Sequence, residues 1–158
     1  MVKVPLGHPN PYVRLWRNLP WPPPDSENEA SRVIRNRVWT LNEVKAIAEK
    51  QCQGGGNHVI SLNEKCTNDI QKLAFTAEAL GERILELEDV NYRNSMWCTR
   101  SHLQGMTMRW EQLWFPCDAY ALRRRERLDT GWEGMVEYYF KFCLNPGKDR
   151  IFLFSVHV

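Results

Sequence analysis

Two runs rich in aromatic and β-branched residues lie near the end of the sequence, at residues 135–144 and 151–158. The segment between them, 145–150, reads Asn-Pro-Gly-Lys-Asp-Arg, a composition that favours a turn. The two runs are therefore predicted to pair as an antiparallel β-hairpin. Because both runs are strongly apolar, the hairpin should lie in the interior of a sheet, with helices covering at least one face.

Helical patterns begin near residue 40. Thr40 and Glu43 have the threonine-x-x-glutamate spacing of a capping box, which predicts that a helix begins at Thr40. This helix should end before the glycines at 54–56, because glycine is costly in a helix interior. The residues that follow, 58–62, are predicted to be extended.

Two further helices are predicted before residue 90. Thr67 is the expected N-cap of a short helix over residues 69–73, and Thr76 is expected to cap a longer one. The apolar face of the longer helix would carry Ala77, Leu80, Ile84 and Leu87. After residue 90 the signals turn to strands. The sequence therefore predicts an α+β fold, an antiparallel β-sheet with two or three N-terminal helices packed on it.

The first 37 residues differ in composition from the rest. They contain prolines at positions 5, 9, 11, 20, 22, 23 and 24, which disfavour a regular helix or a central strand. We predict a proline-rich N-terminal extension over residues 1–37 and one domain over residues 38–158, a length that allows a single hydrophobic core.

The expected location is the cytoplasm, with no membrane partner. No segment has the roughly 20 consecutive apolar residues that cross a bilayer, and the N-terminus lacks the apolar stretch of a signal peptide. The five cysteines are scattered and form no Cys-x-x-Cys pair, which favours free thiols over a disulfide framework or a zinc site. We expect no metal ion and no other cofactor.

The net charge of +2 hides an uneven distribution. The window 90–127 holds seven arginines and three acidic residues, a local excess of four positive charges. The arginines are Arg93, Arg100, Arg109, Arg123, Arg124, Arg125 and Arg127. Arginine forms forked hydrogen bonds with phosphate and stacks on bases, so this window is a candidate for nucleic-acid binding.

The predicted hairpin also places polar side chains together. Tyr139 and Lys141 are two residues apart and should face the same side of the sheet. Ser155 and His157 share a side of the partner strand in the same way, and the matching register would put them beside Tyr139 and Lys141. A phenol, an ammonium group and an imidazole together suit proton transfer and the stabilisation of developing negative charge.

Several segments resemble the motility quorum-sensing regulator (MqsR) family of bacterial toxins, in the same order along residues 40–158. They are Thr40–Lys45 (TLNEVK), Leu87–Met96 (LEDVNYRNSM), Trp114–Tyr120 (WFPCDAY), Tyr138–Phe142 (YYFKF) and Phe154–His157 (FSVH). Together they are similar to the family's opening helix, its tyrosine and serine-methionine stretch, its aspartate-x-tyrosine segment and its last two strands.

This resemblance implies a type II toxin with a RelE-like fold that cleaves messenger RNA without a metal and is neutralised by a cognate antitoxin protein. Tyr139 matches the family's catalytic tyrosine. The family's catalytic lysine falls on Arg93 or Asn94, and its glutamine before the aspartate falls on Cys117. These two departures leave the identity of the catalytic cation open.

The residues and the resemblance together define the candidate site. The catalytic candidates are Tyr139, Lys141, Arg93 and His157. The RNA-binding candidates are Arg123, Arg124, Arg125 and Tyr120.

Other functions compete with this one. The main alternative is a toxin-fold binding protein or inhibitor, encoded on a mobile element, that has lost catalysis; Asn94 and Cys117 motivate it. A cysteine hydrolase built on Cys98 with His102, or on Cys117 with Asp118, ranks lower because no nucleophile signature surrounds either thiol.

Overall fold

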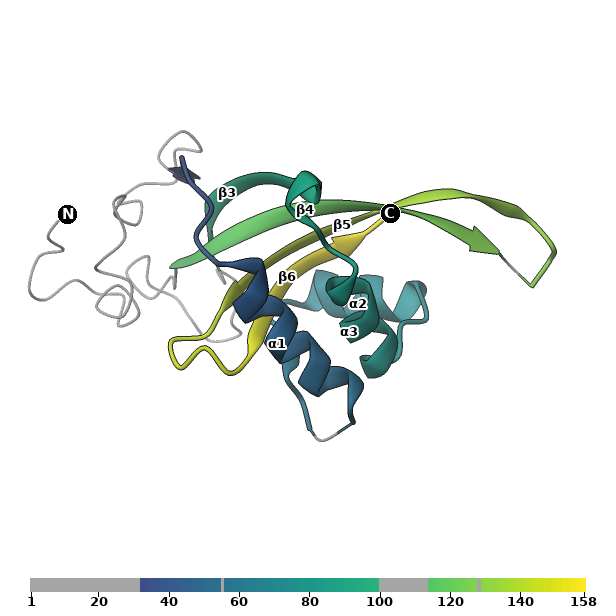
Figure 1. The fold of residues 1–158 in the computed structure, drawn as a ribbon, viewed down its shortest axis with the longest axis horizontal. Coiled ribbons are helices and arrows are strands. Elements are labelled where there is room, and N and C mark those ends of the chain that lie inside the picture. Colours follow the sequence, from purple (N-terminus) through teal and green to yellow (C-terminus); the bar gives the residue numbers. More distant parts are fainter. Residues whose placement is uncertain (1–31, 55, 100–113, 128) are drawn as a thin grey trace, which may run out of the picture.

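The computed structural model describes residues 32–54, 56–99, 114–127 and 129–158. These residues form a six-stranded β-sheet, in the order β1-β3-β4-β5-β6-β2, and three α-helices (Figure 1). The strands are β1 Val33–Ile34, β2 Val59–Ser61, β3 Tyr92–Thr99, β4 Trp114–Arg127, β5 Glu133–Leu144 and β6 Ile151–His157. The helices are α1 Leu41–Cys52, α2 Glu64–Lys72 and α3 Ala77–Leu85, with a 3-10 turn, η3, at Asp89–Asn91. The predicted α+β class is confirmed.

The arrangement differs from the prediction in two respects. The sheet is mixed, because the edge strand β2 pairs in parallel with β6, Val59 opposite Ile151. The helices do not form one N-terminal block either, since β1 precedes α1 and β2 separates α1 from α2. Parallel partners lie far apart in the sequence, so no local pattern reveals their direction. No helix in the described part of the chain is long and apolar enough to cross a membrane.

Two of the three predicted helix starts are confirmed. Thr40 caps α1 and accepts a hydrogen bond from the backbone N–H of Glu43 at 3.3 Å, and Thr76 caps α3. The prediction for α2 is wrong: its N-cap is Asn63, whose side chain accepts from the N–H of Cys66 at 2.7 Å, and Thr67 lies within the helix. A tertiary contact supports this start, because the Asn63 amide also donates to the carbonyl of Phe154 on β6 at 2.9 Å.

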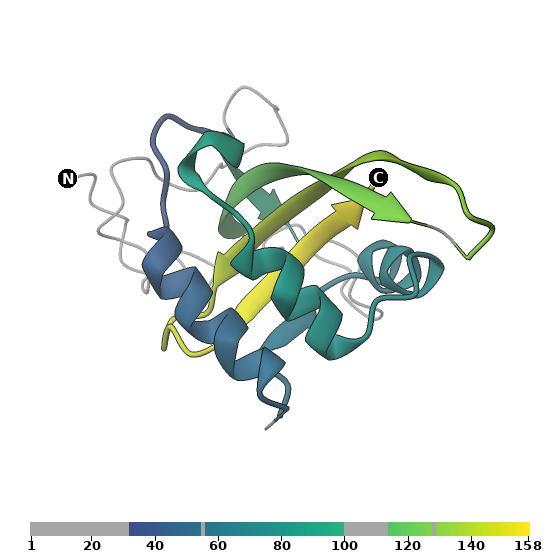
Figure 2. The same ribbon diagram turned by 45° about the vertical axis from the view of Figure 1, so that its right-hand side comes forward.

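Helices α1 and α3 pack against each other on one side of the sheet, and α2 lies beside β6 (Figure 2). Leu80 and Ile84 of α3, and Leu87 just after the helix, are buried as predicted, whereas Ala77 is exposed. Gly81 is buried at the contact with α1. A Cβ atom there would lie 3.0 Å from the carbonyl oxygen of Ala48 and 2.9 Å from the sulfur of Cys52. The glycine therefore sets the close approach of the two helices.

We expect Gly81→Ala to destabilise the protein, although alanine favours helices. Overpacking costs about 1–3 kcal/mol against the roughly 1 kcal/mol gained in helix propensity, so the free energy of unfolding should fall by up to about 2 kcal/mol. Urea denaturation measures this change. Adding Cys52→Ala should recover part of the loss, because it removes one of the two clashing atoms. A Gly81→Ala protein more stable than the wild type would contradict this packing.

The predicted hairpin is confirmed by β5 and β6, which occupy interior positions of the sheet. Phe140 and Phe142 of β5 face α1 and α3 and are fully buried, together with Val156 of β6. Tyr139 and Lys141, which alternate with these phenylalanines along β5, face the opposite side of the sheet. No helix of the described part of the chain packs on that side (Figures 1 and 2). We call this opposite side the open face.

Candidate functional site

Four polar side chains meet on the open face, where β5 pairs with β6. Tyr139 lies opposite His157, and Lys141 lies opposite Ser155, so the predicted face and register are confirmed. The rings of Tyr139 and His157 stack, with centroids 4.9 Å apart and planes inclined by 27°. The Lys141 ammonium lies 5.9 Å from the centre of the Tyr139 ring. We call these four residues the hairpin cluster.

The hairpin cluster is accessible to a ligand at its outer end. His157 is exposed, and Tyr139, Lys141 and Ser155 are half-buried. The imidazole and the phenol therefore sit at the surface beside an ammonium group. An imidazole both accepts and donates protons near neutral pH, and a cation beside it stabilises developing negative charge.

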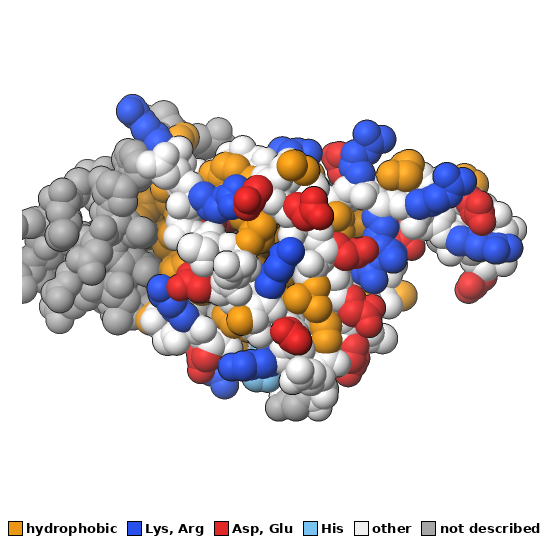
Figure 3. Space-filling view, viewed as in Figure 1, with side chains coloured by type: hydrophobic (Ala, Val, Ile, Leu, Met, Phe, Trp, Pro, Cys, Tyr) orange, Lys and Arg blue, Asp and Glu red, His pale blue; other side chains and the backbone are white. Residues whose placement is uncertain are grey.

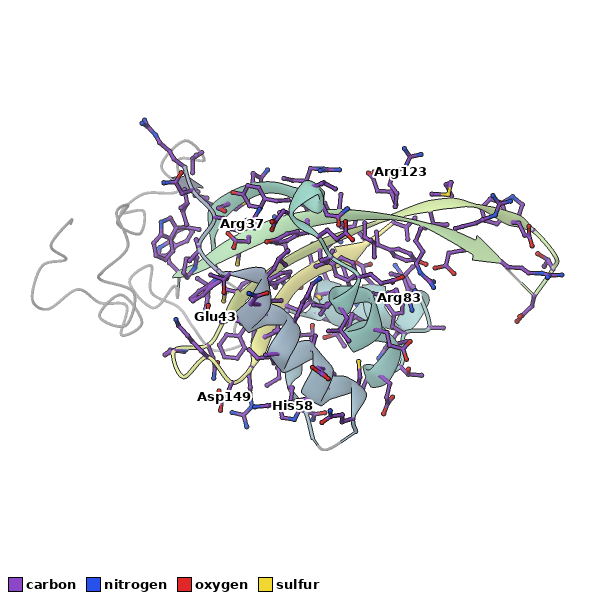
Figure 4. The ribbon with its side chains drawn as sticks, viewed as in Figure 1. Arg37, Glu43, His58, Arg83, Arg123 and Asp149 are labelled. Atoms are coloured by element: carbon purple, nitrogen blue, oxygen red, sulfur yellow. The ribbon has the colours of Figure 1, made fainter. Side chains whose placement is uncertain are left out.

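Strand β4 continues the open face on the other side of β5. Ala119 and Ala121 lie opposite Lys141 and Tyr139, and both alanines are buried. Arg123 follows on the same face, opposite Glu137, and its side chain points away from the helices (Figure 4). Arg123 is exposed and makes no ion pair with any other described residue. It is therefore an available cation one register step from Tyr139.

Strand alternation separates the three consecutive arginines. Arg125 shares the open face with Arg123, whereas Arg124 points to the helix side. There Arg124 bridges Glu86 at the end of α3 (3.2 Å) and Glu126 (2.5 Å), and its side chain is only 31% exposed. The prediction that Arg124 binds RNA together with its two neighbours is therefore not supported by its position, which ties β4 to α3.

Tyr120 is also on the helix side, and its predicted contact with RNA is wrong. The side chain is fully buried, and its ring stacks on Phe142 with centroids 5.5 Å apart. Burial raises the pKa of the Tyr120 phenol well above its usual value, while the nearby Arg37 guanidinium opposes that rise. A buried phenol of this kind has no access to a polynucleotide on the open face.

The two positions that match the family's lysine lie at a bulge in β3, between Tyr92 and Asn94. Asn94 lies opposite Ala119, and Ala119 lies opposite Lys141. Asn94 therefore belongs to the same cross-strand row as Lys141 of the hairpin cluster, two strands away. Arg93 is exposed, and its guanidinium donates to the carbonyl oxygens of Val90 (3.2 Å) and Tyr92 (3.3 Å). The structure therefore places Arg93 at the start of β3 and not within the cluster.

Sequence reasoning missed the role of Asp118. This fully buried carboxylate accepts hydrogen bonds from the backbone N–H groups of Val38 (3.0 Å) and Trp39 (2.8 Å) and from the hydroxyl of Ser95 (2.5 Å). Burial raises the pKa of Asp118, and these donors act against the rise. The phenol of Tyr92 extends the network to Ser95 at 2.6 Å. Asp118 thus joins the segment before α1 to the centre of the sheet.

The cysteine hydrolase alternative finds no support in the described residues. A hydrogen bond with Cys117 and burial raise the pKa of the Cys98 thiol, and burial raises that of Cys117. Thiols with raised pKa values are poor nucleophiles. His102 lies outside the described residues. Within the described ranges, no three histidine, cysteine or acidic side chains are grouped to hold a metal ion.

Comparison with known proteins adds no assignment. No family model matches the chain, and no curated protein matches it.

Proposed function

We propose that this protein is an endoribonuclease, the toxin of a type II toxin-antitoxin system, and that the hairpin cluster cleaves messenger RNA without a metal ion. The observation that carries the proposal is the stacked Tyr139–His157 pair with the Lys141 ammonium beside it. This pair lies on a sheet face to which Arg123 adds a second available cation. A proton acceptor, a phenol and two cations are the groups that metal-free RNA cleavage needs.

The reaction that suits these groups is attack of a ribose 2′-hydroxyl on the adjacent phosphorus. The His157 imidazole accepts the hydroxyl proton as the O2′–P bond forms, and the P–O5′ bond then breaks. The leaving 5′ oxygen takes a proton from the Tyr139 phenol, which gives a 2′,3′-cyclic phosphate and a 5′-hydroxyl. Lys141 and Arg123 stabilise the added negative charge of the phosphorane, and Tyr139 holds the imidazole by stacking.

The resemblance to the MqsR family supports the same proposal. It suggests a RelE-like arrangement of sheet and helices, RNA as substrate, a cognate antitoxin as protein partner and action in the cytoplasm. The catalytic tyrosine of that family corresponds to Tyr139, which belongs to the hairpin cluster. We propose Lys141 as the catalytic cation, because neither Arg93 nor Asn94 brings a positive charge to this cluster.

A binding protein that retains the toxin fold without catalysis is the second candidate. Asn94 favours this candidate. It lies in the cross-strand row of Lys141, at a position that matches the family's catalytic lysine, and it is uncharged. Such a protein would bind RNA or the antitoxin and leave RNA intact.

The test is to incubate the purified protein with a defined single-stranded RNA in the presence of a metal chelator and to map both ends of every cut. We expect cleavage to continue in chelator and to leave 2′,3′-cyclic phosphate and 5′-hydroxyl ends. An RNA whose riboses carry 2′-O-methyl groups is the matched control, since it lacks the attacking hydroxyl and should remain uncut. Intact RNA would favour the binding protein, and 3′-hydroxyl ends would contradict the proposed reaction.

A further inference from the structure

Strands β4 and β5 extend beyond the rest of the sheet. Strand β3 pairs with β4 only as far as Tyr120, and β6 pairs with β5 only from Tyr139 onward. Residues 122–127 and 133–138 therefore form a two-stranded ribbon with no further strand beside it in the described part of the chain. We call this ribbon the arm. It projects from the body of the molecule, at the right of Figure 1.

One face of the arm continues the open face of the sheet. Alternation along β4 places Arg123, Arg125 and Arg127 on this face, next to Ala121 and hence to the Tyr139–His157 pair. Arginine side chains follow the arm toward its tip, with acidic residues between them (Figure 3). The hairpin cluster thus lies at the base of a row of three arginines.

The two outer arginines are available to an anionic ligand. Arg125 and Arg127 have side chains that are 73% and 77% exposed, and both turn to the single carboxylate of Glu133, at 3.6 and 3.7 Å. Long, exposed ion pairs of this kind contribute little to stability. A phosphate group that approaches the arm can therefore replace Glu133 as the partner of either guanidinium.

The spacing of the row fits an extended polynucleotide. Residues two apart on a strand are about 6.6 Å apart along its axis, so the row from Arg123 to Arg127 covers roughly 13 Å. Neighbouring phosphates of an extended single strand are separated by a comparable step, and the unpaired bases of a single strand are free to contact the protein, unlike those of a duplex. Met135, opposite Arg125 on this face and 53% exposed, adds an apolar surface for a base.

We propose that the arginine face of the arm binds the sugar–phosphate backbone of single-stranded RNA that leads away from the hairpin cluster. The inference deepens the proposed function, on which it rests for the identity of the ligand. It predicts that the protein holds more nucleotides than the cluster alone contacts, and that single strands bind better than duplexes. Among the described residues, neither outer edge of the arm pairs with another strand, so a strand of a partner protein could add there. The row of three arginines favours RNA over a protein strand as the ligand of the arm.

Fluorescence anisotropy with labelled 2′-O-methyl RNA tests the proposal, since this probe cannot be cut by the proposed reaction. We compare single strands of about four and about twelve nucleotides and a duplex of the longer sequence. Arg125→Gln/Arg127→Gln should weaken binding of the long strand about 5–30-fold and leave the short strand nearly unaffected. Loss of two phosphate contacts should also reduce the slope of log K against log salt by about 1.4.

Two further variants sharpen the test. Lys148→Gln/Arg150→Gln removes the same charge from the exposed loop between β5 and β6, outside the arginine face, and should bind the long strand nearly as the wild type does. Glu133→Gln removes the competing carboxylate and should tighten binding about 2–5-fold. A purely structural role for these ion pairs would not produce tighter binding.

The outcomes separate the arm from the catalytic proposal. Equal affinity of wild type and Arg125→Gln/Arg127→Gln for the long strand, with an unchanged salt slope, would overturn the arm proposal and leave the unpaired edges for a protein strand. Equal affinity of the wild type for the long single strand and for its duplex would overturn the proposed preference for single strands. Uncut RNA that still binds the arm would reject the proposed nuclease and retain the arm as a binding surface.

Discussion

Lys141→Ala is expected to lower the rate of RNA cleavage about 100-fold or more, because removing one preorganised stabiliser of transition-state charge typically costs that much. Lys141 is the cation of the hairpin cluster nearest to the Tyr139 ring, and it lies opposite Ser155 beside the exposed His157. In the proposed reaction its ammonium group stabilises the phosphorane charge. Single-turnover cleavage of a defined RNA measures the effect.

Matched variants separate this role from a general effect of charge. Lys148→Ala removes an exposed lysine from the loop between β5 and β6 and should leave the cleavage rate close to that of the wild type. Lys141→Arg keeps the charge and should restore part of the activity. Tyr139→Phe keeps the stack on His157 but removes the phenol that is proposed to protonate the leaving oxygen, so it should also lower the cleavage rate. Wild-type cleavage rates in folded Lys141→Ala and Tyr139→Phe proteins would rule out the hairpin cluster as the active site.

Asp118→Ala is expected to destabilise the fold by about 3–5 kcal/mol, because each buried donor left without a partner costs roughly 1–3 kcal/mol. The substitution removes the acceptor of two backbone N–H groups, at Val38 and Trp39, and of the Ser95 hydroxyl. The sum is partly offset by water that reaches the released segment and by relief from burying a charge. Urea denaturation followed by circular dichroism measures the free energy of unfolding.

Two controls accompany this measurement. Asp129→Ala changes an exposed aspartate in the turn between β4 and β5 and should alter the free energy of unfolding by less than about 0.5 kcal/mol. Ser95→Ala removes one of the three donors and should cost less than Asp118→Ala. If Asp118→Ala is as stable as Asp129→Ala, the buried carboxylate does not hold the segment before α1 in place.

Features encoded within a few neighbouring residues were predictable. The capping residues Thr40 and Thr76 satisfy the first N–H groups of their own helices, and the register of the last hairpin follows from its short loop and its apolar alternation. The same alternation correctly placed Tyr139 and Lys141 on one face. These features need no knowledge of the rest of the chain.

Features that depend on which surface is covered were not predictable. Three consecutive arginines on a strand must divide between two faces, but only the packing of α3 shows that Arg124 meets Glu86. Tyrosine is a residue type that often binds ligands, but Tyr120 is buried because it stacks on Phe142 on the side of the sheet that the helices cover. Likewise, Asn63 and Thr67 are both acceptable caps, and the contact of Asn63 with β6 decides between them.

The sequence by itself determined the local elements of this protein: two of its helix starts, the final hairpin and the alignment of a phenol, an ammonium group and an imidazole along that hairpin. The tertiary structure alone decided which sheet face lies under helices, the parallel pairing of β2, the burial of Asp118 and the projection of the arm. The reason is physical. Alternation and capping act over two to four residues, whereas burial depends on contacts between segments far apart in the sequence, such as that of Asp118 with Val38.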